Sequence, residues 1–335
     1  MTEPLEIARI EGDGVGPELV AAGTRVIESL GLPVTWVDLP AGHSAYEEFG
    51  TTAPPHTLAE LRRIGVAIKG PFRTPNGGTV RSANHYIRHH LGLYAAVRPI
   101  AAAPGRPPIL LVREQLEDLY GAIEWMATPD VAQAVKVASR SGCERITRYA
   151  FELARSEKRE HVLLVHKANN LKLTEGLFLD VAAEVAKRYP DLGFSDMLAD
   201  SAASTLVLRP ESMDVVLTSH TIGDILSNVG AAVAGSLGLV GSLNSGESAH
   251  VAEAAHGDAA ELAGQDRVNP VAFIEGVALL LRAVGRREEF AVLSDALADL
   301  RTRGPRTLDL GGRASTSQVV DELCGFVSAR REAAA

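Results

Sequence analysis

Residues 5–30 read LEIARIEGDGVGPELVAAGTRVIESL, and this stretch decides the fold class. Residues 5–10 predict a short strand, residues 11–18 a glycine-rich turn, and residues 19–30 a helix with apolar side chains at helical spacing. The next apolar run, residues 33–39, is strand-like again. This alternation of strand and helix indicates an α/β architecture.

The alternation continues along the chain. Further helices are predicted at residues 57–64, 143–156, 181–189 and 269–284, and further strands at residues 65–69, 109–113, 161–166 and 214–218. Residues 70–80 predict a loop because they are rich in glycine and proline, and Ser82 is suited to cap the helix that follows. Residues 230–243 predict a buried helix and loop. Asp200 and Asp224 each follow an apolar segment, and we expect them in short polar loops.

The composition is typical of a soluble globular protein. The chain has 335 residues, which predicts about two domains, and 46% of them are hydrophobic. A net charge of −9 argues against a general nucleic-acid surface, and no run reaches the roughly 18 apolar residues of a membrane span. Cys143 and Cys324 lack CxxC spacing, and residues 1–10 do not resemble a signal peptide, so we expect a cytoplasmic protein.

A cluster of arginines predicts the charge of the ligand. The stretch that closes on Tyr120 contains Arg81, Arg88, Arg98 and Arg113. A guanidinium group matches a carboxylate or phosphate with two parallel hydrogen bonds, so several converging arginines indicate a ligand with more than one carboxylate. Arg81, Asn84 and Arg88 are three and four residues apart, which places them on one side of a predicted helix.

The glycine-rich turn GDGVGP (residues 12–17) is weak support for a Rossmann fingerprint. Pro17 stands where the helix of that motif would begin, and the spacing of the glycines is wrong. A tight strand-to-helix turn explains the glycines equally well.

Other side chains suit metal binding or acid–base chemistry. Carboxylates such as those of Asp200 and Asp224 bind Mg²⁺ or Mn²⁺, although aspartates at strand ends more often cap helices or face solvent. Lys167 directly follows a buried strand, where a lysine is usually a surface residue but can act as a base when desolvated. The histidines of HYIRHH (residues 85–90) suggest a zinc pair, but no third ligand is evident.

Nine motifs occur in an order that resembles one enzyme family. They are GDGVGPE (12–18), KGPFRTP (69–75), RSANHYIRHHLGLYAAVRP (81–99), REQLEDLYGAIEW (113–125), HKANNLKLTEGLF (166–178), the Asp200 loop, GDILS (223–227), HGDAAELAGQDRVNP (256–270) and RGPRTLDLGG (303–312). Together they resemble the β-decarboxylating dehydrogenases, which include isocitrate, homoisocitrate, 3-isopropylmalate, tartrate and D-malate dehydrogenases. The resemblance covers nearly the whole chain.

The resemblance implies a two-domain α/β fold like that of isocitrate/isopropylmalate dehydrogenases. Residues 1–99 and 236–335 would form a large cofactor-binding domain, and residues 100–235 a small domain that carries the dimer interface. The active site would lie in the cleft between the two domains, and the cofactor would bind without a standard Rossmann motif.

The resemblance also implies a role for each matching side chain. Tyr120 would protonate the enol carbon after CO₂ leaves, and Lys167 would assist removal of the hydroxyl proton. The substrate carboxylates would be bound by Arg88, Arg98 and Arg113. Asp200 and Asp224 would hold Mg²⁺ or Mn²⁺, and Asn228 stands where a further metal-site aspartate is usual. Lys167 and Asp200 would enter the site from the neighbouring subunit, which implies a homodimer.

The cofactor residues implied by the resemblance lie mostly near residues 253–269. They are Thr74, Glu253, His256, Gly257, Glu261 and Asn269. Glu261 stands where an acidic residue marks users of NAD and a lysine marks users of NADP. A carboxylate accepts hydrogen bonds from both ribose hydroxyls and repels a 2′-phosphate, so we predict NAD.

Two polar residues predict the class of substrate. Ser82 and Asn84, in the pattern RSxNxxxR, resemble isocitrate dehydrogenases, in which they would meet a γ-carboxylate. Polar groups reject an apolar tail because such a tail would leave them unpaired. We therefore predict an isocitrate-like tricarboxylate or a phosphonate analogue. The chain length and the C-terminal RGPRTLDLGG look more like short homoisocitrate members, so homoisocitrate, 3-isopropylmalate and tartrate-type substrates are alternatives.

The chain departs from the family pattern near the expected nicotinamide and metal. The departures are Gln115, Leu116, His220, Asn228, Asp258 and Ala260. Loss of the carboxylate at Asn228 should weaken the cation or alter its ligands. These changes leave a second interpretation open, a non-catalytic regulatory subunit of a hetero-oligomer. Retention of Tyr120 and Lys167 favours an active NAD-dependent decarboxylase that binds a small polycarboxylate.

Overall fold

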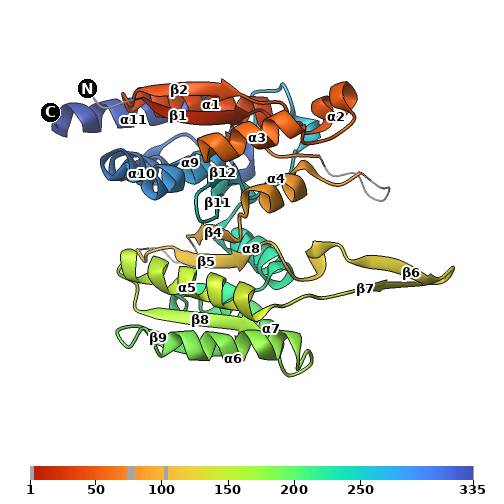
Figure 1. Cartoon of the computed structure of the whole chain (residues 1–335). Coiled ribbons are helices and arrows are strands. Elements are labelled where there is room, and N and C mark those ends of the chain that lie inside the picture. The colour runs from red at the N-terminus through yellow and green to blue at the C-terminus, as the bar shows by residue number, and fades with distance from the viewer. Residues whose placement is uncertain (1–3, 74–79, 102–104, 335) are drawn as a thin grey trace. The chain divides into compact units, whose positions relative to one another are not determined.

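The chain divides into two compact units, which are described one at a time. The computed structural model describes residues 4–73, 80–101 and 105–334 (Figure 1). The first unit comprises Met1–Leu93 and Gly235–Ala335, and the second comprises Tyr94–Ala234. The sequence predicts a boundary after residue 99, whereas the observed boundary precedes strand β4 (Ala95–Ile100). Strand β4 belongs to the second unit because it pairs along its whole length with β5 (Ile109–Glu114).

The first unit contains a mostly parallel sheet in the order β2–β1–β3–β12–β11. Its strands are β1 (Leu5–Ile10), β2 (Val34–Asp38), β3 (Val66–Lys69), β11 (Gly241–Ser245) and β12 (His250–Ala254). Successive residues of β1 face opposite sides of the sheet, so Ile7 belongs to one hydrophobic core and Ala8 to another. Both faces of this sheet are therefore buried.

Helices cover both faces of these five strands. The larger core packs α1 (Gly16–Ser29), α9 (Val271–Ala283), α10 (Arg287–Arg303) and α11 (Thr316–Ala334). The smaller core packs α3 (Pro55–Ile64) and α4 (Ala83–Leu91), while α2 (His43–Phe49) precedes them in the chain. The first unit also contains short 3₁₀ turns at Leu237–Leu239, Ala260–Leu262 and Leu308–Leu310.

The second unit repeats this plan around its own five strands, in the order β4–β5–β10–β8–β9. The three further strands are β8 (His161–His166), β9 (Gly193–Leu198) and β10 (Val215–Thr218). One face packs against α5 (Arg140–Ser156) and α6 (Thr174–Ala186), and the other against α7 (Ala199–Leu208) and α8 (His220–Ala234). The hairpin of β6 (Glu124–Thr128) and β7 (Val131–Ala134) projects away from this sheet (Figure 1).

The backbone of the glycine-rich turn packs closely against other loops of the first unit. Gly14 has a φ of +59°, and a Cβ atom there would lie 2.0 Å from the carbonyl oxygen of Asp258. The Asp13 carboxylate accepts hydrogen bonds from the backbone N–H groups of His43 and Arg73, both at 2.8 Å. The structure thus supports the tight-turn interpretation of GDGVGP.

Helices begin earlier than the sequence predicts in the second unit. Helix α6 starts at Thr174 rather than at residue 181, and α8 starts at His220, where we expected a loop. The expectation that Asp200 and Asp224 lie in short polar loops is wrong, because Asp200 is in the first turn of α7 and Asp224 is on α8. Helices α7 and α8 each begin within two residues of the preceding strand, which leaves no room for a loop.

Other expectations agree with the structure. The strand predicted at residues 161–166 is β8, and Ser82 caps α4 as expected, because its side chain accepts a hydrogen bond from Asn84 N. The prediction of a buried helix and loop at residues 230–243 is correct only in part, because these residues hold the end of α8, a 3₁₀ turn and the first part of β11, and some of them are exposed. Within the described ranges, no helix is long and apolar enough to cross a membrane.

Candidate active site

Asp224 lies at the centre of a group of charged side chains in the second unit. Its side chain is 36% exposed, and its Oδ1 atom lies 2.8 Å from Arg113 Nη1 and 3.8 Å from Arg98 Nη1. Arg98 Nη1 also donates a hydrogen bond to Ser227 Oγ. Both guanidinium groups are buried, where a charge requires a partner of opposite sign. The structure thus joins two of the predicted substrate arginines to a predicted metal ligand. We call Asp224, Arg98, Arg113 and Tyr120 the Asp224 group.

Gly223 allows Arg113 to lie along α8. A Cβ atom at Gly223 would be 2.7 Å from Arg113 Cγ and 2.8 Å from Thr218 Cγ2, so a larger residue would displace the arginine. Arg113 Nε donates a hydrogen bond to the backbone oxygen of His220 at 2.8 Å. The beginning of α8 therefore fixes the direction of the Arg113 side chain.

Tyr120 joins this group from the turn that follows β5. Its hydroxyl donates a hydrogen bond to Asp224 Oδ2 at 3.3 Å, and its ring packs edge-on against His220 with centroids 5.0 Å apart. Burial, and then the nearby Asp224 carboxylate, raise the pKa of the Tyr120 hydroxyl above its ordinary value. The hydroxyl is therefore protonated at neutral pH, as a proton donor must be.

Asn228 lies four residues after Asp224, on the same side of α8. Its Nδ2 atom donates to the backbone oxygen of Asp224 at 2.9 Å, so the amide can offer its oxygen to a cation. Carboxylate and amide oxygens are ligands that suit Mg²⁺ or Mn²⁺. In the described part of the chain, no group of three or more His, Cys, Asp or Glu side chains is placed to hold a metal. The donors on α8 fit a hard cation but need further ligands to complete its coordination.

Lys167 and Asp200 form a separate pair on other elements of the second unit. Lys167 directly follows β8, and its Nζ atom donates a hydrogen bond to Asp200 Oδ1. This bond lowers the pKa of the Asp200 carboxyl. The two side chains are 32% and 65% exposed, so the pair is accessible to another molecule.

Arg88 is held in a buried network of the first unit. Glu253 Oε1 lies 3.1 Å from Arg88 Nη2 and accepts a hydrogen bond from Asn244 Nδ2 at 2.8 Å, while Glu253 Oε2 accepts from Lys69 Nζ. Burial alone would raise the pKa of Glu253, but the charges of Lys69 and Arg88 outweigh burial and hold it well below its ordinary value. Glu253 was expected to contact the cofactor, yet its carboxylate is engaged in orienting Arg88.

Ser82 and Asn84 stand at the beginning of α4, on the helix that carries Arg88. The Ser82 hydroxyl accepts from Asn84 N at 3.3 Å, so it is already used as the helix cap. The buried Oδ1 atom of Asn84 has no hydrogen-bond partner within the described ranges. Of these two predicted substrate residues, Asn84 has the side chain with a free polar atom.

The predicted cofactor residues differ in whether their side chains are near the surface or are hydrogen-bonded within the protein. His256 Nδ1 lies 2.9 Å from the backbone oxygen of Gly257, and burial lowers the pKa of its ring, so the ring is neutral at pH 7. Glu261 is exposed on a 3₁₀ turn, where its carboxylate can reach a ligand. Thr74 lies outside the described residues.

Asn269 is the predicted cofactor residue whose side chain is already hydrogen-bonded to other residues of the protein. Its Oδ1 atom accepts from the backbone N–H of Val271 at 3.0 Å, at the start of α9, and its Nδ2 atom donates to Asp309 Oδ2 at 3.0 Å. The residue is also buried. Its side chain therefore supports the fold of the loop, and one N–H donor and one acceptor position of the amide remain for a further contact.

The zinc interpretation of the α4 histidines finds no support. The rings of His85 and His89 have centroids 4.4 Å apart, but Arg81 Nη1 lies 2.9 Å from His85 Nε2. Burial, and then the nearby positive charges, lower the pKa of His85 to about 4. A positive charge at this distance opposes a metal cation.

Some contacts of the predicted residues escaped the sequence analysis. Lys69 and Asn244 hold Glu253, and Ser227 accepts from Arg98. The available signal was the charged residue at the end of the apolar strand VAIK, because a lysine enclosed with apolar residues needs a buried anion.

Comparison with known proteins identifies relatives along nearly the whole chain. The family model described as isocitrate/isopropylmalate dehydrogenase matches residues 6–323. The isocitrate/homoisocitrate dehydrogenase of Thermus thermophilus is 40% identical over 328 residues, which cover 95% of this chain and 97% of that protein. The 3-isopropylmalate dehydrogenase of Archaeoglobus fulgidus is 37% identical, over 96% of this chain and 99% of that protein.

The fold has the same relatives. The crystal structure of isocitrate dehydrogenase from Methylococcus capsulatus matches with a TM-score of 0.92 at 38% identity, covering 96% of this chain and 99% of that chain. The names of further relatives include NAD and NADP forms of isocitrate dehydrogenase and regulatory subunits. The resemblance and the fold class predicted from the nine motifs are confirmed. The chain belongs to the isocitrate/isopropylmalate dehydrogenase family.

Proposed function

We propose that this chain catalyses the NAD-dependent oxidative decarboxylation of an isocitrate-like 2-hydroxy tricarboxylic acid, or a phosphonate analogue, with Mg²⁺ or Mn²⁺. The Asp224 group carries the proposal, because it combines two buried arginines, a proton donor and a carboxylate. Arg88, whose guanidinium group is partly buried beside Glu253, supplies a third site for a carboxylate. Asn84 would contact the γ-carboxylate from the same helix.

The four site residues of the second unit each have one role in the proposed reaction. Arg98 and Arg113 hold the substrate by its carboxylates, which fixes the C–H bond that is to be broken. Lys167 assists removal of the hydroxyl proton, and Tyr120 delivers a proton to the enol carbon after CO₂ has left. A bound cation supplies the charge that favours ionisation of the hydroxyl, and NAD supplies the hydride acceptor.

Glu261 supports the choice of NAD over NADP. Its carboxylate is exposed on the turn that follows His256 and Gly257, two further predicted cofactor residues. A carboxylate can accept hydrogen bonds from both ribose hydroxyls, and it repels the 2′-phosphate of NADP. Glu261→Lys should therefore shift the ratio of activities toward NADP.

The first experiment measures NADH formation by the purified protein with Mn²⁺ and isocitrate, with NADP in a parallel reaction. Homoisocitrate, 3-isopropylmalate and tartrate are assayed in the same way, because these are the alternative substrates. Turnover with isocitrate and NAD supports the proposal. Turnover with 3-isopropylmalate alone contradicts the roles of Ser82 and Asn84.

Exposed apolar side chains support a second copy of the chain as partner. Large apolar residues are exposed on or beside the β6–β7 hairpin and on α7 and α8, namely Ile123, Trp125, Met126, Val207, Leu208 and Ile225. Exposed apolar surface of this kind is buried when two proteins associate. We propose a homodimer in which Lys167 and Asp200 serve the active site of the neighbouring subunit.

Hybrid dimers test this sharing directly. One chain carries Tyr120→Phe and the other carries Lys167→Met, so each homodimer lacks one group in both sites. If the groups are shared, one site of the hybrid keeps both Tyr120 and Lys167, and about half of the activity returns. A hybrid as inactive as its parents contradicts the exchange of Lys167 between subunits.

Asn228 favours one alternative function, that of a regulatory subunit. An amide in place of a carboxylate reduces the negative charge available to a cation. A chain of this kind binds the tricarboxylate without turnover, which calorimetry detects. Saturable binding of isocitrate with no turnover for any substrate or cofactor would replace the catalytic proposal with this one.

A further inference from the structure

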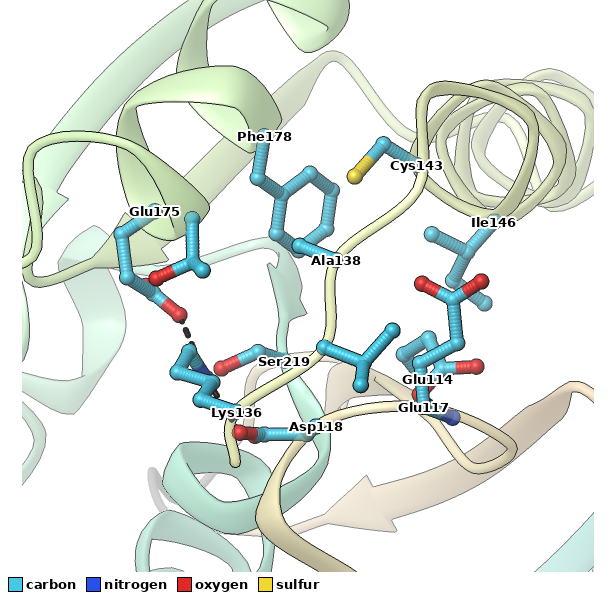
Figure 2. A pocket seen from close by; sticks show the side chains of 12 residues that line it. Glu114, Glu117, Asp118, Lys136, Ala138, Cys143, Ile146, Glu175, Phe178 and Ser219 are labelled. Atoms are coloured by element: carbon cyan, nitrogen blue, oxygen red, sulfur yellow. Dashed lines mark hydrogen bonds and ion pairs between the residues drawn. The ribbon is translucent and has the colours of Figure 1, made fainter. Parts of the chain in front are cut away.

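A cavity in the second unit is lined by four carboxylates and one lysine. The carboxylates are those of Glu114, at the end of β5, of Glu117 and Asp118 in the loop that follows, and of Glu175 in α6. Among the described residues that line the cavity, Lys136 alone carries a positive charge, and it lies between Asp118 and Glu175 (Figure 2). Lys136 comes from the segment that joins the β6–β7 hairpin to α5.

Lys136 bridges two buried carboxylates. Its Nζ atom contacts Asp118 Oδ1 and lies 2.8 Å from Glu175 Oε1. The three side chains are only 12%, 3% and 1% exposed, respectively. Burial alone would lower the pKa of Lys136, but its hydrogen bonds to Asp118 and Glu175 raise it above the ordinary value, so the ammonium group stays charged.

Asp118, one of the two carboxylates bound by Lys136, holds the turn that carries Tyr120. Asp118 Oδ1 accepts a hydrogen bond from Leu119 N at 2.8 Å, which caps the 3₁₀ turn Leu119–Gly121 that carries Tyr120. Asp118 Oδ2 accepts from Thr221 N at 2.8 Å, in the first turn of α8. Asp118 has a φ of +73°, a strained conformation for an aspartate, and these bonds hold it there.

The Glu175 end of the bridge leads to Lys167. Glu175 lies in the first turn of α6, and its Oε2 atom accepts a hydrogen bond from the backbone N–H of Lys167 at 3.0 Å. Glu175 Oε1 faces Lys136, so one carboxylate is shared between the bridge and the residue that follows β8. The position of the Lys167 backbone therefore depends on Glu175.

From these contacts, and resting on the proposed function, we propose that Lys136 is a positioning residue that fixes Tyr120 and Lys167 through Asp118 and Glu175. Lys136 itself is two contacts away from both functional groups and would touch neither substrate nor cofactor. Without its charge, Asp118 and Glu175 would be two buried carboxylates on neighbouring segments, and their repulsion would displace both segments.

Three variants of the full-length protein test the proposal. Lys136→Met keeps the length of the side chain and removes its charge, whereas Lys136→Arg keeps a cation that can reach two carboxylates. Lys187→Met is the matched control, because Lys187 is an exposed lysine at the end of α6. Thermal unfolding and circular dichroism identify any variant that fails to fold.

The first readout needs no activity. Hydrogen exchange reports on the backbone amides of Leu119, Lys167 and Thr221, which donate to the bridged carboxylates. We expect these amides to exchange roughly tenfold faster in Lys136→Met, and at the original rate in Lys136→Arg and Lys187→Met. Unchanged exchange in a folded Lys136→Met protein would overturn the positioning role, whether or not the enzyme turns over.

The second readout separates positioning from general stabilisation. We expect Lys136→Met to lower kcat roughly tenfold to 100-fold with KM changed less than about threefold, because the arginines that bind substrate are not displaced. Lys136→Arg should restore most of kcat. In a Tyr120→Phe, Lys167→Met background, Lys136→Met should lower the residual rate no further.

The outcomes separate this proposal from the proposed function. An inactive wild-type protein in which Lys136→Met still accelerates exchange at the three amides disproves the function and keeps the bridge. An active enzyme in which Lys136→Met leaves kcat unchanged disproves the bridge and keeps the function. If Lys136→Met lowers kcat by the same factor in the Tyr120→Phe, Lys167→Met background as in the wild-type protein, Lys136 has a purely structural role. That result would also overturn the proposal.

Discussion

Glu253 in the first unit and Asp224 in the second both bind arginine, but in different surroundings. The Glu253 side chain is 6% exposed and bonds to Lys69, Arg88 and Asn244. The Asp224 side chain is 36% exposed, with its bonds to Arg113 and Tyr120. One carboxylate is enclosed by its partners, whereas the other keeps a face open to solvent.

This difference distinguishes a supporting carboxylate from one that can change its partner. Water cannot replace the partners of Glu253, so its ion pairs persist and orient Arg88. At Asp224 the open face allows a cation or a substrate group to approach, and the two buried arginines keep positive charge beside it. We expect substitution of Asp224 to affect activity first, and substitution of Glu253 to affect stability first.

Asp224→Asn should have the largest effect on activity. The amide keeps the shape of the side chain but removes the charge that faces the arginines and the proposed cation. We expect kcat/KM to fall about a thousandfold, equivalent to ~4 kcal/mol, in a titration with Mn²⁺ and NAD. Asp180→Asn, on the exposed side of α6, is the control and should be unchanged. Near-normal turnover in Asp224→Asn would contradict a direct role of the Asp224 carboxylate in the reaction.

Glu253→Gln tests the other half of the comparison. Loss of the buried carboxylate leaves Lys69 and Arg88 without their shared partner, which should lower the free energy of unfolding by about 3 to 4 kcal/mol. Urea unfolding measures this change, with Glu60→Gln in an exposed ion pair with Arg63 as control. A stability equal to that of the parent protein would contradict the supporting role of Glu253.

A third carboxylate, that of Glu114, sharpens the comparison. It is buried like Glu253, but it accepts hydrogen bonds from the backbone N–H groups of Leu116 and Glu117, and burial raises its pKa from 4.5 to about 7. Between these two values the unfolded chain has released the proton while the folded chain retains it. The stability associated with protonated Glu114 is therefore complete below pH 4.5 and is lost as the pH rises through about 7.

Glu114→Gln should remove this dependence on pH. The stability of the wild-type protein relative to the variant should fall by about 3 kcal/mol between pH 4.5 and pH 8, since one pKa unit corresponds to about 1.4 kcal/mol. Urea unfolding at a series of pH values measures the difference between the two proteins. A difference that is constant with pH would mean that Glu114 titrates alike in the folded and unfolded chains.

The sequence predicts the α/β class well, because apolar runs and turn glycines are local signals. It fails at the beginning of α8, where Gly223 weakens the helical pattern while packing against Arg113 favours the helix. The Asp224 group was predicted only through the order of its motifs, since Arg98 and Asp224 are far apart in the chain. Propensity carries no information on such distant contacts.

The bridge of Lys136 had no comparable signal. Lys136 follows a strand of exposed residues, and a lysine in that setting is normally on the surface. It is enclosed because folding brings Asp118 and Glu175 to it from two other segments. Side chains that act through other side chains are therefore the part of a site that the sequence predicts least.

Asn228→Asp should have the smallest effect, and it tests how open the Asp224 side of α8 is. The change places a second carboxylate four residues after Asp224, so a cation bound there would gain one negative ligand. We expect the Kd for Mn²⁺ to fall about tenfold, equivalent to ~1.4 kcal/mol, in calorimetric titrations of the full-length protein.

The control for this change is Gln133→Glu, which adds the same charge on the exposed strand β7. The control separates a local ligand from the general effect of net charge, because both variants carry one additional negative charge. An equal Kd in the two variants would place the cation away from Asn228. A tighter Kd in Asn228→Asp alone would mean that the open face of Asp224 is where the cation binds, which is the property that distinguishes Asp224 from the enclosed Glu253.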